Sequence, residues 1–454
     1  MAADLEDRVG RALDRMSREV TPDPTLPPPV RRGVRRRTAG AAVALTTAVA
    51  LLVSATVVGI RWMGRFGVQP GVAPACSWST VPAPSADPSR FDTYLRSVTA
   101  SGPDDAWAVG IYREPGEGST VHMELQHWDG TSWSETTAPP ILGYGEGPSV
   151  FGAASTGPDD SWAVGLQDAE QGGVPLGLHW DGRSWSVAEM PETGEPESHL
   201  WATSALSSGD VWAVGNWARP GKLEGGGLAL HWDGTRWQDV PVPQAPPVAD
   251  TGGPYDSLES VSGSGSDDVW AVGSSVNVPE TTSQTLTLHW DGTSWSIVAS
   301  PNVQPEPGTG NVDNTLAAVA ATARDDAWAV GSYEEMGLRR DEPTTSRPLA
   351  LHWDGTGWSV VPLPDVGQGG LNGIAAVDRN DVWGVGQTTT SSGGDHAVRP
   401  LLLHWDGSGW SRVAAPMDSD ASLSAVAAIP GGGLWAVGTQ GPGSPAKSLV
   451  LRCS

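Results

Sequence analysis

Apolar and polar residues alternate in short runs along most of this chain, and four such runs recur in a fixed order. In one copy the order is LAAVAAT (316–322), an acidic pair, WAVG, LALHW, Asp-Gly and TGWSVVPLP (356–364). A period of two is typical of half-buried strands, and the acidic pair and Asp-Gly are turn signals. Asp-Gly predicts a two-residue type I′ hairpin, which needs positive φ at both central residues. Each copy is therefore predicted to be a four-stranded antiparallel sheet.

Three phrases that contain tryptophan mark this repeat. A WAVG-type phrase occurs seven times, with its tryptophans 50 to 58 residues apart, and HWDG occurs six times, each followed five residues later by a third tryptophan. The chain has 23 Trp but only 5 Tyr and 3 Phe, so a repeated structural need must explain them. We expect these indoles to fill the space between neighbouring sheets. They are Trp78, Trp107, Trp128, Trp133, Trp162, Trp180, Trp185, Trp212, Trp232, Trp237, Trp270, Trp290, Trp295, Trp328, Trp353, Trp358, Trp383, Trp405, Trp410 and Trp435.

Four short strands that repeat about every 54 residues predict one blade of a β-propeller. Seven copies predict an all-β, seven-bladed β-propeller. The seventh copy stops at Ser454 without its Asp-Gly or its last strand, whereas CSWS followed by TVPAP (76–84) matches TSWS and the subsequent TTAPP (131–140). We therefore expect an N-terminal strand from residues 76–84 to close the last blade.

The two cysteines of the chain belong to this closing hairpin. Cys76 and Cys453 align with Thr131 and Trp128, which flank Asp-Gly in the first copy, so we expect them to face each other and form a disulfide. Disulfides persist outside the cell. The alternative is a lipid-modified Cys76, but VAPAC lacks the usual leucine and lies well past the apolar segment.

An uncharged stretch of 22 residues at 39–60 is long enough to cross a bilayer as a helix. Five arginines within 31–37 precede it and Arg61 and Arg65 follow it, which predicts a cytoplasmic N-terminus. A cleaved signal peptide is the alternative, but the stretch is too long and lacks a nearby small-x-small site. The predicted domains are a cytoplasmic tail with a short amphipathic helix and a Pro/Arg-rich linker (1–38), a transmembrane helix (39–60), a linker (61–75) and the propeller (76–454).

The tail carries apolar residues at helical spacing from Leu5 to Val20, interleaved with arginines. This stripe docks on another protein or on the anionic membrane face, or it is a frayed tail whose arginines only set the topology. Both interpretations stay open.

Charge and composition restrict the partners. Residues 1–65 hold 11 Arg and 6 acids, which leaves 16 basic and 46 acidic residues beyond them, a net charge of −30. So acidic a surface repels phosphate backbones, and nucleic-acid binding is excluded for the propeller. The basic residues are 25 Arg and 2 Lys, a usage typical of a GC-rich bacterial genome.

The repeat resembles the kelch repeats of the galactose-oxidase-like propeller superfamily. Kelch blades run about 50 residues and carry a glycine after the second strand and a tryptophan after the third-to-fourth turn. Gly110 with Trp133, and Gly165 with Trp185, match this pattern, and so on through residues 76–454. A double glycine is absent, and HWDG is a signature of its own. WD40 repeats, at about 40 to 45 residues, are too short.

Two enzymatic relatives of that superfamily do not fit. Galactose oxidases hold copper with His and Tyr, one tyrosine being joined to a cysteine, whereas both cysteines here are assigned to closure. Sialidase Asp boxes place Asp five residues before Trp, but Asp129 precedes Trp133 by four. We therefore expect no cofactor, no metal and no catalytic residue.

The repeated polar residues have structural interpretations. The six HWDG histidines lie one per blade, too far apart to converge on one metal ion, and are expected to be half-buried hydrogen-bonding groups. They are His127, His179, His231, His289, His352 and His404. Acidic pairs such as Asp104 and Asp105 are expected to bond backbone amides at turns, with an axial ring of cations as the alternative.

The variable segments carry the functional prediction. Alternating strand direction places the constant turns on one face and the long connections on the other, where exposed aromatics suit a carbohydrate or peptide or only pack the loops. The expected inserts and linkers are 111–123, 332–348, 387–400, 141–148, 243–256 and 302–315, and the aromatics are Tyr112, Tyr144, Trp201, Trp217 and Tyr333.

We therefore expect a single-pass protein of the cell membrane whose extracytoplasmic propeller binds or senses a protein or carbohydrate ligand on the long-loop face. The alternatives are a cell-surface hydrolase or lyase that acts on polysaccharide, and a relay through the tail to a cytoplasmic regulator.

Overall fold

The chain divides into two units, Met1–Val72 and Ala73–Ser454. The computed structural model describes residues 76–454 with gaps at 85–91, 115–119, 142–144, 146, 170–171, 196, 220–224, 245–254, 278–281, 306–309, 338–343, 393–394 and 442–444. The predicted tail, membrane helix and linker (1–75) lie outside the described residues. Within the described ranges the elements run from β1 to β28 and all are strands. No helix in this part of the chain is long and apolar enough to span a membrane.

Four antiparallel sheets are built from consecutive strands, each paired with the next in sequence. The first two contain β2 (Asp92–Gly102), β3 (Asp105–Arg113), β4 (Val121–Trp128) and β5 (Trp133–Glu135), then β6 (Ser149–Gly157), β7 (Asp160–Ala169), β8 (Gly172–Trp180) and β9 (Trp185–Val187). The other two contain β18 (Val312–Ala323), β19 (Asp326–Glu335), β20 (Thr345–Trp353) and β21 (Trp358–Val360), then β22 (Gln368–Asp378), β23 (Asp381–Ser392), β24 (Asp395–Trp405) and β25 (Trp410–Val413).

Two further four-stranded units merge into one eight-stranded sheet through a single parallel pair, Gly225 with Tyr255. The first unit is β10 (Glu197–Ser207), β11 (Asp210–Ala218), β12 (Gly225–Trp232) and β13 (Trp237–Asp239), and the second is β14 (Tyr255–Gly265), β15 (Asp268–Asn277), β16 (Thr282–Trp290) and β17 (Trp295–Ile297). The remaining sheet has the order β1 (Trp78–Thr80), β28 (Lys447–Cys453), β27 (Leu434–Gln440) and β26 (Ala421–Ala428).

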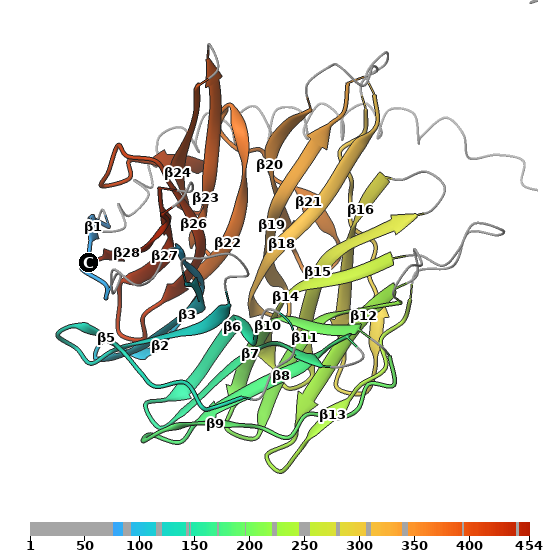
Figure 1. The fold of residues 1–454 in the computed structure, drawn as a ribbon. Coiled ribbons are helices and arrows are strands. Elements are labelled where there is room, and N and C mark those ends of the chain that lie inside the picture. The colour runs from blue at the N-terminus through green and yellow to red at the C-terminus, as the bar shows by residue number, and fades with distance from the viewer. Residues whose placement is uncertain are drawn as a thin grey trace, which may run out of the picture. The chain divides into compact units, whose positions relative to one another are not determined.

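These units follow one another around a common centre. The first strands of successive units touch, from β2 and β6 through to β22 and β26, and β26 touches β2 in turn. Figure 1 shows β6, β10, β14, β18 and β22 toward the middle and short last strands such as β9 and β13 at the outside. The predicted all-β, propeller-like fold with repeated four-stranded antiparallel sheets is therefore confirmed.

Indole rings occupy the spaces between neighbouring units. Trp107 on β3 is fully buried, and its ring centroid lies 4.8 Å from those of Trp180 and Trp185 in the next sheet. Trp435 packs in the same way on Trp128 and Trp133, at 5.0 and 5.1 Å, so the last sheet contacts the first. Edge-to-face rings at these distances add to the stabilisation from buried apolar area.

The last sheet is closed by an N-terminal strand, as predicted from the matching CSWS and TSWS segments. Strand β1 has only three residues, and Trp78 pairs with Cys453 as Trp133 pairs with Trp128. Cys76 and Cys453 form a disulfide with Cα atoms 5.5 Å apart. The expectation that the two cysteines face each other in the ladder was wrong by two residues, because Cys76 precedes the strand and reaches its partner diagonally.

The Asp-Gly connections are wider than the predicted two-residue turns. Since Trp128 pairs with Trp133, four residues lie between β4 and β5. Asp129 Oδ1 accepts hydrogen bonds from the backbone N–H groups of Thr131 and Ser132, both at 2.8 Å, and Gly130 has a φ of 92°. Together with the Thr131 hydroxyl, these donors lower the pKa of Asp129 to about 2. The carboxylate thus organises the loop, which a type I′ turn would not require.

The three expected inserts each begin and end within strands. Residues of 387–400 continue β23 and β24, with Gln387 paired to Pro400 and Thr390 to Ala397. Strands β3 and β4 extend into 111–123, and β19 and β20 extend into 332–348. Linkers 243–256 and 302–315 end within β14 and β18. Runs rich in threonine and other residues that favour strands explain why these segments stay in the sheet.

Candidate ligand-binding cavity

A bulge interrupts the first strand of every four-stranded unit at the same place. In β2 the register shifts between Leu95 and Ser97, so Arg96 has no partner on β3. Leu95 pairs with Gly110, where an added Cβ would overlap the carbonyl oxygen of Tyr94. The repeated WAVG glycine is therefore required by the bulge, which re-aims one side chain of the neighbouring strand.

The bulge residue lies 14 residues before that glycine in every unit. It follows a buried Leu or Val and precedes Gly, Ala or Ser, so its neighbours are nearly constant. The bulge residues themselves differ from unit to unit and are Arg96, Phe151, Trp201, Glu259, Ala317, Asn372 and Ser424.

All of these bulge residues line one cavity of about 700 Å³, which we call the axial cavity. Its wall is completed by Gln387, Thr389, Val398 and Ser422. Thr389 and Val398 are paired residues beside the connection between β23 and β24, so the cavity extends to the face of the long connections. Its volume falls within the range of small-ligand sites, about 300–1,000 Å³.

Two aromatic rings form one side of the axial cavity. The Phe151 and Trp201 centroids lie 4.9 Å apart with a 47° angle between the rings. Trp201 Nε1 donates to Asn216 Oδ1 at 2.6 Å, and Asn216 Nδ2 donates to the Tyr255 hydroxyl at 2.9 Å. The hydrogen bonds fix the orientation of the indole, so its face is a preorganised contact surface.

The charged members of the cavity lining are Arg96 and Glu259. Burial raises the pKa of the Glu259 carboxyl, which accepts a hydrogen bond from the Ser257 hydroxyl at 2.6 Å. Arg96 is exposed, and its Cζ lies 5.8 Å from the Tyr94 ring centroid. Partial desolvation of its guanidinium among the neighbouring side chains lowers its pKa. A guanidinium stays protonated through any such shift, whereas the carboxyl is more readily neutralised.

An amide pair within one unit also bonds the backbone of the next unit. Asn372 Nδ2 donates to Gln387 Oε1 at 2.6 Å and to the Leu423 carbonyl oxygen at 2.8 Å. Ser422 and Ser424 continue this side of the cavity. The axial cavity thus combines a cation, an aromatic surface and several neutral hydrogen-bonding groups.

The HWDG histidines lie elsewhere, each on the third strand of its own unit. His127 Nε2 hydrogen-bonds to Asp105 Oδ1 at 2.7 Å, and its ring lies 4.4 Å from that of Trp107. The same His–Asp pair recurs in the five other units that carry HWDG. The prediction of half-buried, hydrogen-bonded histidines is confirmed, while their partner was missed because it lies 19 to 26 residues earlier in the chain.

The acidic pairs were interpreted incorrectly as groups that bond backbone amides. The second member, such as Asp105, bonds the histidine and the Ser101 hydroxyl. The first member, such as Asp104, packs against the glycine of the Asp-Gly loop, Gly130. In the described part of the chain, no three His, Cys, Asp or Glu side chains gather as metal ligands.

The aromatics expected on the loop face have different environments. Trp201 lines the axial cavity, Tyr112 stacks on His122 at 4.8 Å, and Trp217 lies 5.6 Å from the Arg219 guanidinium. Tyr144 lies outside the described residues. Sequence reasoning missed Arg96, Phe151, Glu259 and Asn372 as cavity residues, although their fixed distance from the WAVG glycine was a usable signal.

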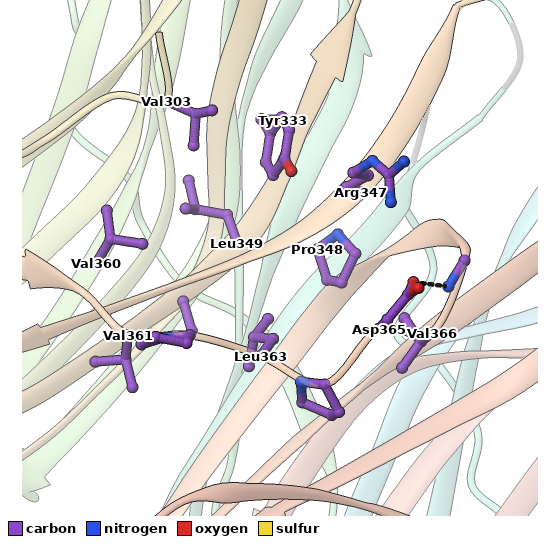
Figure 2. A pocket seen from close by; sticks show the side chains of 14 residues that line it. Val303, Tyr333, Arg347, Pro348, Leu349, Val360, Val361, Leu363, Asp365 and Val366 are labelled. Carbon is purple, nitrogen blue, oxygen red and sulfur yellow. Dashed lines mark hydrogen bonds between the residues drawn. The ribbon is translucent and has the colours of Figure 1, made fainter.

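Tyr333 lines a separate pocket of about 320 Å³. Figure 2 shows its ring beside Arg347 and Leu349, with Asp365 accepting a hydrogen bond from the Gly367 backbone N–H at 3.0 Å. Most of the pocket wall is aliphatic and comes from β20 and the segment after β21. This pocket lies beside one unit, whereas the axial cavity receives a different side chain from each.

No family model and no curated protein matches this sequence. Solved structures with a similar fold include an ulvan lyase of polysaccharide lyase family PL25 bound to -[GlcA(1-4)Rha3S]-, with 11% identity, a TM-score of 0.51, and coverage of 82% of this chain and 95% of that one. YCF48 bound to a D1 peptide has 14% identity, a TM-score of 0.47, and coverage of 83% of this chain and 94% of that one. The WD40 β-propeller domain of Doa1 has 11% identity, a TM-score of 0.45, and coverage of 82% of this chain and 97% of that one. At these identities the likeness shows the fold alone.

Proposed function

We propose that this protein is a binding or sensing module whose ligand occupies the axial cavity. The observation that carries the proposal is the set of bulge residues, which vary in chemistry while their sequence neighbours stay nearly constant. A scaffold that repeats its core and varies one inward position per unit presents a surface unique to each unit. A protein segment or a carbohydrate fits the cavity's mixture of aromatic and hydrogen-bonding groups.

We also propose that the propeller has seven blades. The eight-stranded sheet contributes two of them, because β10 and β14 each carry their own bulge and the two units share a single ladder pair, Gly225 of β12 with Tyr255 of β14. The kelch-like assignment remains a prediction that rests on the WAVG glycine and the following TSW tryptophan.

The hydrolase or lyase alternative has one specific observation in its favour, the raised pKa of Glu259 in the cavity. Glycoside hydrolysis generally uses a pair of carboxyl groups. Among the described residues that line the axial cavity, Glu259 is the single carboxyl. Binding therefore accounts for this lining better than hydrolysis does.

We further propose that residues 39–60 anchor the propeller at the outer surface of the cell membrane. The support is the uncharged stretch and the arginine excess before it. Protease added to intact cells should then remove the propeller and leave the tail protected. Loss of the tail with survival of the propeller would reverse the orientation, and recovery of the whole chain in the soluble fraction would refute the anchor.

Replacement of Trp201 tests the proposed site. Peptide and glycan libraries are screened with the wild-type chain, with Trp201→Ala and with Trp217→Ala, a matched change outside the cavity lining. For ligands of the wild type, Trp201→Ala should weaken binding by about 1–3 kcal/mol, roughly 5- to 150-fold, because a preorganised aromatic surface is lost. Trp217→Ala should have little effect. Unchanged affinity in a folded Trp201→Ala protein would place the site elsewhere.

A further inference from the structure

The charge of the axial cavity differs from that of the chain around it. Residues 66–454 carry 16 basic and 46 acidic side chains, yet Arg96 is the only cation among the described cavity residues and Glu259 the only acid. With one basic and one acidic side chain, the described lining is balanced in charge, so the interior is locally less negative than the exterior. A single anionic group would find a cation inside the cavity, while a polyanion would be repelled by the acidic surface.

The neutral lining has the chemistry of a saccharide site. Amide and hydroxyl groups come from Asn372, Gln387, Thr389, Ser422 and Ser424, against only two aliphatic lining residues. Such groups donate and accept hydrogen bonds, as sugar hydroxyls do. A peptide with apolar anchor residues would need deeper aliphatic pockets than these.

The aromatic side supplies the remaining contact. An indole face carries partial negative charge, which complements the polarised C–H groups on one face of a pyranose ring. Asn216 holds Trp201 through a 2.6 Å hydrogen bond, so the platform is ordered before a ligand arrives. Phe151 extends it toward the unit that carries Arg96, because β6 touches both β10 and β2.

We infer that the ligand of the axial cavity is a saccharide with one carboxylate, a uronic acid residue, whose ring lies on Trp201 and whose carboxylate meets Arg96. This inference rests on the proposed function and names its ligand class. A guanidinium pairs with a carboxylate through two parallel N–H···O bonds, which gives a charged group of defined orientation. Two rings of a saccharide fit a cavity of about 700 Å³.

The test is calorimetric titration of the full chain, in detergent, with the methyl glycosides of D-glucuronate, D-galacturonate, D-glucose and D-galactose. One uronide should bind with a Kd of about 1 mM, as expected for a ligand of its size. It should bind on the order of tenfold more tightly than its neutral counterpart, because only the uronide carries the anion that Arg96 recognises.

Variants separate the carboxylate contact from the platform. Arg96→Gln should reduce the preference for the uronide to about onefold, while the matched change Arg379→Gln, at an exposed arginine paired with Asp325, should leave it intact. Trp201→Ala should weaken the binding of both the uronide and its neutral counterpart. Failure of both uronides to bind, or a preference that survives Arg96→Gln, would overturn the inference. If peptides or neutral glycans bind and depend on Trp201, the cavity remains the ligand site and only the acidic saccharide is refuted.

Discussion

A chain with Cys76→Ser should unfold about 3–6 °C below the wild type. The Cys76–Cys453 disulfide closes a loop with a sequence separation of 377 residues and holds the three-residue strand β1 on β28. Removal of such a disulfide costs about 2–5 kcal/mol, mainly through the entropy of the unfolded chain. For a domain of this size that free energy corresponds to the stated change in melting temperature. Scanning calorimetry under oxidising conditions measures it.

The controls for this prediction use reduction and deletion. Dithiothreitol should lower the melting temperature of the wild type to that of Cys76→Ser and leave the variant unchanged. Deletion of 76–84 should cost more, because Trp78 also packs edge-on against Trp383 at 5.5 Å, and the exposed edge of β28 should promote association. Alkylation of both thiols without prior reduction, or a lipid on Cys76, would contradict the closure.

Gly215→Ala should destabilise the protein by about 1–3 kcal/mol and also impair the cavity. A Cβ at residue 215 would overlap the carbonyl oxygen of His199, so the β10 bulge must shift. The residue aimed by that bulge is Trp201, whose position should shift with it. Denaturant unfolding measures the first effect, and ligand affinity measures the second.

Gly357→Ala is the matched control, because an added Cβ there meets no atom within 4 Å. It should leave both stability and affinity nearly unchanged. Equal stability of the Gly215→Ala and Gly357→Ala proteins would show that the bulge does not require its glycine.

The architecture was predictable because its determinants repeat. Each unit carries its strands, turn residues and packing tryptophans within a short stretch, and the match between Cys76–Ser79 and Thr131–Ser134 located the closing strand. The predictions that were wrong concern local geometry, which the alternation of apolar and polar residues does not reveal. The Asx-type loop at Asp129 adds two residues to the expected turn, and the extended pairing of Thr390 with Ala397 converts an expected loop into sheet.

The candidate site was predicted only in part. The long-connection face and Trp201 were named, but Arg96 and Glu259 were not, because a strict period of two does not reveal a bulged residue in a strand. The His127–Asp105 pair was hidden for another reason, since it joins residues on different strands. The constant residues of the repeat are thus explained by groups on other strands. The histidine bonds an aspartate, and the WAVG glycine is required because a Cβ at Gly110 would overlap the carbonyl oxygen of Tyr94.

The most direct measurement is a crystal structure of the protein with a ligand obtained from the library screen. We predict density within the axial cavity, with the ligand in contact with the Trp201 ring and with side chains from several of the first strands. Density confined to the pocket beside Tyr333, or to the outer rim, with the axial cavity filled only by water, would contradict the account.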